Sequence, residues 1–191
     1  MLLREVALLL LLVTTAKASL GSATSLRWEL FTGDGNLPND AVVGGYQKVN
    51  NAIKPHYIAR AFNPDGGVIP IAVCKSSDDR RWLGWGAWND GEGSAASIQQ
   101  YEVACVDKLK VRWVPAVAGN LPDGAVPAGV DAKGQNLYAC RSFDSSLNPK
   151  DRNHFMMMTP GVLLPYSGAC KVNFFGVKSF STYEVLVVVD D

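Results

Sequence analysis

Short apolar or alternating runs recur along the chain from Leu26 onward, and Gly, Pro, Asn and Asp interrupt them at intervals of about ten residues. This spacing is typical of strands joined by turns. Gly and Pro are too frequent for a long amphipathic helix, because no stretch of about ten residues keeps a clean helical period between them. The pattern therefore predicts an all-β fold, with strands at 27–31, 56–62, 68–74, 100–106, 110–115, 136–143, 161–165 and 183–189.

The same order of motifs occurs twice in the chain. The segments GNLPNDAV (35–42) and GNLPDGAV (119–126) agree at six of eight positions. In both cases a Trp precedes the motif, YIARAF or YACRSF follows it, and a Tyr-Glu-Val strand closes the set. Self-similarity at a nearly fixed spacing indicates a tandem duplication. The sequence thus predicts a first repeat at 19–106 and a second at 107–191.

Each predicted repeat is too small for a robust core of its own, because a short chain buries a smaller share of its surface. We therefore expect the two repeats to interleave in one antiparallel, sandwich-like globule. Exchange of a strand between the repeats would also cover an exposed sheet edge. The closing strands at 101–105 and 183–189 are the predicted strands of exchange.

The N-terminal segment has the order of a secretory signal. Arg4 precedes an apolar run at 6–13, and Ala16-Lys17-Ala18 follows it. This order predicts a signal peptide at 1–18 and a secreted mature protein. The run is too short for a membrane span and no other stretch of about 20 apolar residues occurs, so no stable membrane insertion is expected. An uncleaved anchor and a buried N-terminal strand are the alternatives.

Charge narrows the class of partner. The chain holds 18 basic and 18 acidic residues, so its formal net charge is zero. Nucleic acids and anionic membranes select proteins with a basic surface. Neither is therefore expected as the main partner.

Four cysteines, in a chain predicted to enter an oxidising compartment, favour two disulfides. All three connectivities stay open, and buried free thiols are the alternative. The chain has no CxxC pair and only two histidines, so neither a metal site nor a cofactor is expected. The cysteines are Cys74, Cys105, Cys140 and Cys170.

The sequence offers little for catalysis. His154, in the segment DRNHF, could act as a base, but a lone histidine in a loop is more often structural. The motifs G-x-S-x-G and H-E-x-x-H are absent, as is a phosphate-binding glycine loop. We therefore expect a protein without enzymatic activity.

Two features favour binding. Trp82, Trp85 and Trp88 stand three residues apart, and aromatic faces are good platforms for the C–H faces of sugars, although core packing explains the same pattern. Asp131 stands just past Gly129, at the shoulder of a predicted hairpin turn. It could accept hydrogen bonds from ligand hydroxyls or hold its own turn, and the sequence does not separate the two interpretations.

The second half of the chain resembles the DM9 repeat family. The resemblance rests on WVPA, GNLPDGAVPAGVD and GQNLYACR, followed by PYSG and YEVLV, and a weaker copy of the pattern covers the first half. It implies a secreted or cytosolic all-β protein with two interleaved repeats. Some members of that family are mannose-recognising lectins of invertebrate innate immunity.

The resemblance also implies site residues. In the family pattern an Asp after Gly-Tyr and a Lys after Pro-Gly carry sugar binding. Asp131 matches that Asp, Gln47 takes its place in the first copy, and Lys150, after Pro149, is the candidate for the Lys. In the first copy Pro70-Ile71-Ala72 lacks the Lys. These residues predict a mannose-type lectin acting mainly through the second copy, with a structural or protein-interaction module as the alternative.

Overall fold

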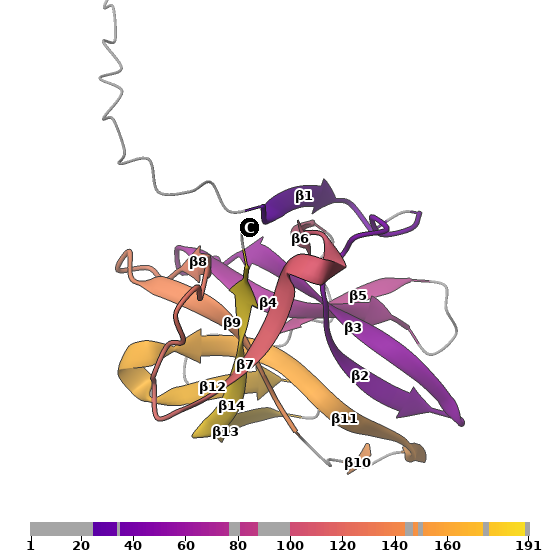
Figure 1. Ribbon diagram of the computed structural model, residues 1–191. Coiled ribbons are helices and arrows are strands. Elements are labelled where there is room, and N and C mark those ends of the chain that lie inside the picture. Colours follow the sequence, from indigo (N-terminus) through magenta and orange to yellow (C-terminus); the bar gives the residue numbers. More distant parts are fainter. Residues whose placement is uncertain are drawn as a thin grey trace, which may run out of the picture.

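Strands dominate the structure, which is a computed structural model (Figure 1). It describes residues 25–33, 35–76, 81–87, 100–143, 147–148, 151–173 and 176–189. Two short 3-10 turns, Lys108–Lys110 and Pro165–Ser167, are the helical elements of this part. The strands are β1 (Arg27–Phe31), β2 (Val43–Val49), β3 (Ala52–Phe62), β4 (Val68–Lys75), β5 (Trp82–Gly86), β6 (Tyr101–Cys105), β7 (Val111–Val117), β8 (Pro127–Val130), β9 (Asn136–Ser142), β10 (Leu147–Asn148), β11 (Asp151–Leu164), β12 (Ala169–Asn173), β13 (Val177–Phe180) and β14 (Thr182–Val188).

The predicted all-β fold is confirmed, and each of the eight predicted strands falls on an observed one. The sequence pattern missed β2, β5, β8, β10, β12 and β13. In β2, Gly44-Gly45 resembles a turn, yet the backbone there is a strand. A Cβ on Gly45 would lie 2.0 Å from the carbonyl oxygen of Met158. Glycine is therefore needed because two strands approach too closely for a side chain.

The strands form one continuous antiparallel sheet and not the two-layered sandwich that the sequence suggested. Within the described residues the order is β13-β12-β11-β2-β3-β4-β8-β9-β14-β7, with β5 on β4, β6 on β3, and β1 on β6. The long strand β11 explains this continuity. Its residues 154–158 pair with β2, and its residues 159–164 pair with β9 and β12.

The two halves of the chain repeat the same pairings. β1-β6-β3-β4-β5 of the first half corresponds to β7-β14-β9-β11-β12 of the second. The register corresponds as well, because Trp28 lies opposite Ala104 and Trp113 lies opposite Leu186. The two equivalent arginines also have matching neighbours. Arg60 lies opposite Pro70 and Glu102, and Arg141 lies opposite Pro160 and Glu184.

Strands also pair across the two halves. β2 of the first half pairs with β11 of the second, where Tyr46 lies opposite Met158. Reciprocally, β8 of the second half pairs with β4 of the first, where Val130 lies opposite Val68. The prediction that the closing strands are exchanged is wrong. In the described pairings β6 contacts β1 and β3, and β14 contacts β7 and β9, so each closing strand is already flanked on both sides by its own half.

The buried core draws on both halves. One cluster joins Ile71, Val73 and Val103 of the first half to Leu137 and Val162 of the second. A core shared in this way makes the two halves depend on each other for burial of apolar surface. Among the helices of the described ranges, none is long and apolar enough to cross a membrane. The predicted signal peptide at 1–18 lies outside those ranges.

The cysteines form one disulfide, and the expectation of two is wrong. Cys140 and Cys170 are bonded, with their Cα atoms 6.0 Å apart, and link β9 to β12. Cys74 and Cys105 are buried free thiols. They belong to β4 and β6, which lie on opposite sides of β3, and each sulfur instead meets a backbone carbonyl, that of Lys75 or of Val103.

Candidate functional site

Asp131 follows β8 and fixes the turn that leads into β9. Its Oδ1 accepts hydrogen bonds from the backbone N–H groups of Lys133 and Gln135, each at 2.8 Å. Gly134 supplies the left-handed conformation that the turn needs, with φ of 78°. The backbone N–H of Gln135 is the largest cause that lowers the pKa of Asp131, so the carboxylate is ionised at neutral pH.

Asp131 also lines a cavity of about 360 Å³. Oδ2 accepts a hydrogen bond from the Tyr166 hydroxyl at 3.3 Å. The floor of the cavity is apolar and the rim is polar, an arrangement typical of small-molecule sites. It lies where the halves meet: its first-half residues include Asn63, Asp65, Ile69 and Ala87, and its second-half residues include Asp131, Lys133, Leu137, Val162, Leu164, Tyr166, Ser167 and Lys171.

The corresponding position in the first half is closed. Gln47 is buried, and its Nε2 lies 3.1 Å from the Cys74 sulfur. By register, His56 stands at the position of Leu137, and Trp85 stands at the position of Lys171. The rings of His56 and Trp85 stack, with their centroids 6.0 Å apart. Gln47 is absent from the described lining of the Asp131 cavity. The structure therefore does not bring the two predicted residues into one site.

The predicted lysine, Lys150, lies outside the described residues. The sheet register gives the second half another Pro-Gly pair: Pro160-Gly161 lies against β9 as Pro70-Ile71 lies against β3. Val162 follows this pair and is 1% exposed on the floor of the Asp131 cavity. An apolar side chain thus stands where the family pattern leads us to expect a cation.

Two cations of the cavity, Lys133 and Lys171, were not among the predicted site residues. In the second half Lys171 lies opposite Val162, and in the first half Trp85 lies opposite Ala72. Lys171 therefore stands at the position that Trp85 holds in the first half. A strand-by-strand alignment of the halves would have revealed this exchange. The two connecting loops differ in length, however, and they obscure the match in the sequence alone.

The tryptophans are mainly structural. Trp82 packs edge-on against Phe31 and Tyr57, each with ring centroids 5.9 Å apart. Trp85 stacks on His56. Trp88 lies outside the described residues. The core-packing interpretation therefore accounts for the first two aromatic rings of the run.

No cluster of three potential metal-ligating side chains occurs in the described part of the chain. The backbone of His154 lies in β11, opposite Val49 of β2. The prediction placed this residue in a loop, and that placement is wrong. Its side chain is outside the description, so its proposed role as a base is not decided.

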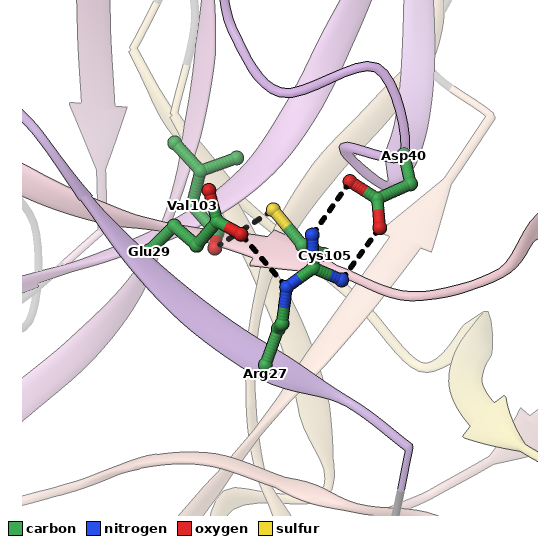
Figure 2. Close-up of polar contacts among 5 residues, drawn as sticks. All are labelled: Arg27, Glu29, Asp40, Val103 and Cys105. Atoms are coloured by element: carbon green, nitrogen blue, oxygen red, sulfur yellow. Dashed lines mark hydrogen bonds and ion pairs between the residues drawn. The ribbon is translucent and has the colours of Figure 1, made fainter.

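Cys105 lies beneath a cluster of charged side chains. Arg27 donates to Glu29 at 2.7 Å and to Asp40 at 2.5 and 2.9 Å, and Figure 2 shows its guanidinium between the two carboxylates. Burial, together with these carboxylates, raises the pKa of the Cys105 thiol to about 11. The thiol is therefore protonated at neutral pH and a poor nucleophile.

A comparison with family models places this geometry in context. Residues 50–147, just over half of the chain, match the model of the DM9 repeat. The chain belongs to the DM9 repeat family. The matched span of this DM9 protein includes β3, Asp131 and the turn that Asp131 holds, and it crosses the boundary at 106 expected between the repeats. No curated protein matches the chain.

Proposed function

We propose that this DM9 protein is a secreted, non-catalytic carbohydrate-binding protein that recognises mannose-type sugars in the cavity beside Asp131. The observation that carries the proposal is that the two oxygens of the Asp131 carboxylate have different hydrogen-bond partners. Oδ1 is held by two backbone N–H groups, while Oδ2 accepts from the hydroxyl of Tyr166, which lines the same cavity as Asp131. A rigid acceptor at a cavity wall suits sugar hydroxyls.

The rest of the cavity supports a neutral polyol as ligand. Asn63, Ser167 and Lys171 offer polar groups at the rim, and Ile69 and Leu164 offer an apolar surface for C–H groups. Asp65 balances part of the positive charge. Binding of this type rests on several hydrogen bonds around an apolar contact, as in other small-ligand sites.

The chain is, in this proposal, a tandem duplication with repeats at 19–106 and 107–191. The matched registers of β3-β4-β6 and β9-β11-β14 support it. Only the second repeat keeps an open sugar cavity, because Gln47 and His56 are buried at the first. By the family resemblance, pattern recognition in innate immunity is the proposed setting.

Calorimetric titration of the mature chain with mannose tests this function. Asp131→Ala should weaken binding by roughly tenfold or more, as expected for hydrogen bonds to a charged group. Asp131→Asn preserves an acceptor for the turn and should weaken binding through loss of charge alone. Gln47→Ala should have a much smaller effect. Because the pKa of Asp131 is lowered, binding should stay constant between about pH 7 and pH 5.

Equal losses at Asp131 and Gln47, or no mannose binding by the native chain, would contradict the proposal. A specific observation favours a second candidate for that outcome, a protein-interaction module. Leu30, Phe62 and Phe143 are 71%, 73% and 67% exposed. Exposed large apolar side chains are typical of protein-binding surfaces where they form a contiguous patch, whereas scattered ones occur on any protein surface. Co-purification of a partner that Phe62→Ser abolishes would support this candidate.

A further inference from the structure

A second cavity, of about 340 Å³, lies beside the first GNLP loop and shares no lining residue with the Asp131 cavity. Leu37 and Pro38 of the loop form part of its wall. Tyr57 of β3 and Trp82 of β5 complete the apolar side. The volume falls within the range of natural small-ligand sites.

Trp82 keeps this cavity open. Its indole N–H donates to the Gly35 carbonyl at 3.0 Å and so holds the loop away from the strands. A Cβ on Gly35 would meet no atom within 4 Å. The GNLP loop of the second half is closed instead: a Cβ on Gly119 would lie 2.3 Å from the Pro165 carbonyl oxygen and 3.2 Å from Gly168.

The register explains the difference between the two loops. The pair Cys74 and Leu83 in the first half is equivalent to the pair Leu164 and Ala169 in the second half. Gly168 therefore stands where the first half has Trp82. Without a side chain at that position, the second loop packs directly on the turn at Pro165–Ser167.

Three lysines line the open cavity: Lys54, Lys75 and Lys108. Lys54 donates to the Ser76 carbonyl at 3.3 Å, and the Lys75 ammonium lies 5.3 Å from the centre of the Trp82 ring. No carboxylate belongs to the described lining. Three cations without a carboxylate among the described lining residues give the cavity a positive potential, which favours an anionic ligand.

Asp40, in the same loop, is held mainly by Arg27, and its charge also acts on Lys108. Figure 2 shows its carboxylate directed at Arg27, which donates to both of its oxygens. In the second half, the positions of Lys54 and Lys75 are held by Gln135 and Pro165. Two of the three cations at the open loop, Lys54 and Lys75, thus have uncharged counterparts at the closed loop.

We propose that this cavity binds a small acidic sugar, a single pyranose-sized ring carrying a carboxylate or a sulfate. The ammonium groups of Lys54 and Lys75 pair with the anionic group. Asn36 and Asn39 offer amides to ring hydroxyls, and the Leu37–Trp82 side contacts C–H groups. The ligand differs in charge from the neutral sugar proposed for the Asp131 cavity, and the two sites are independent.

Calorimetric titration of the mature full-length chain separates the possibilities. The probes are glucuronate and glucose 6-sulfate, compared with glucose and inorganic sulfate. Both acidic sugars should bind at least about tenfold more tightly than glucose or sulfate, since each comparison probe lacks one of the two contacts. Raising salt from about 50 mM to about 500 mM should weaken the acidic sugars and leave mannose binding unchanged.

Variants locate the site. The double variant Lys54→Gln/Lys75→Gln should bind glucuronate roughly tenfold or more weakly. Lys178→Gln, on β13 and outside both cavities, should bind it normally. Binding to the native chain should also shift the indole N–H resonance of Trp82, assigned through Trp82→Phe. Circular dichroism confirms that each variant is folded.

Three results would overturn the proposal. Glucose or inorganic sulfate could bind as tightly as the acidic sugars. The double lysine variant could be folded and keep its full affinity for glucuronate. The Trp82 indole resonance could stay unmoved at saturating glucuronate. If Asp131→Ala abolishes mannose binding and leaves glucuronate binding intact, the two cavities bind their ligands independently.

Discussion

The guanidinium carbon of Arg141 lies 4.4 Å from the centre of the Trp113 ring. The same arginine donates to Glu184 at 2.5 Å. An equivalent group occurs in the first half, where Arg60 lies 4.3 Å from the Trp28 ring centre and donates to Glu102 at 2.6 Å. Each group connects three strands, because the tryptophan, the arginine and the glutamate come from different ones.

Removal of either arginine should destabilise the protein. Arg141→Met keeps the aliphatic stem and should lower the free energy of unfolding by about 1–3 kcal/mol, from lost ion pairing and cation–π contact. Arg60→Met should cost less, because its side chain is 27% exposed and that of Arg141 is 19% exposed. Urea unfolding measures both. Arg112→Met, at an exposed arginine that contacts only nearby carbonyls, is the control, and an equal cost there would contradict the interpretation.

The disulfide should stabilise the fold by restricting the unfolded chain. Cys140 and Cys170 are 30 residues apart, so Cys140→Ala/Cys170→Ala should lower the unfolding free energy by about 2–4 kcal/mol. Thiol titration of denatured, unreduced protein should find Cys74 and Cys105 alone. Four reactive thiols would show that the bond is absent, and none would show a second disulfide.

Cys105 should resist alkylation in the folded protein and react once urea exposes it. Because its pKa is raised from 9.0 to about 11 in the fold, the unfolded state ionises first as pH rises. The contribution of this thiol to stability is therefore complete below pH 9 and is lost between pH 9 and about 11. Thermal unfolding of native protein and Cys105→Ala across that range measures the difference. Rapid labelling by iodoacetamide at neutral pH would contradict the burial.

The halves 19–106 and 107–191 should not fold separately. Each would lose a strand partner, because β2 pairs with β11 and β8 pairs with β4 across the halves. Circular dichroism and proton NMR of the isolated halves should indicate unfolded chains, and mixing them should restore structure. Dispersed spectra from either half alone would disprove this dependence.

The sequence predicted the strand content well because alternation of apolar and polar residues reports which side of a sheet is buried. The sequence did not predict β2, because that strand depends on backbone geometry and not on a side-chain pattern. Gly45 has no side chain, and this allows the backbone of Met158 to approach closely. The candidate site was predicted in part. Asp131, a predicted site residue, holds its own turn and lines a cavity, whereas Lys171 lines the same cavity through a strand register that the short motifs do not contain.

The predicted exchange of closing strands failed for a related reason. Tyr101 and Tyr183 begin strands whose apolar runs indicate burial, and burial alone does not reveal the neighbouring strand. The neighbour was decided by β11, whose length allows it to continue from β2 to β9. Strand length of this kind depends on tertiary contacts as well as on local pattern.

The reciprocal pairing of β2 with β11 and of β8 with β4 has the form of a two-fold dimer whose subunits are joined end to end. In a true homodimer every substitution appears in both subunits, so paired sites must change together. A fused chain is free of that constraint. By register, Gly168 stands at the position of Trp82 and Lys171 at that of Trp85, so the two halves carry different side chains at these equivalent positions. A single chain with this arrangement can therefore present two different surfaces at equivalent places on a nearly symmetric sheet.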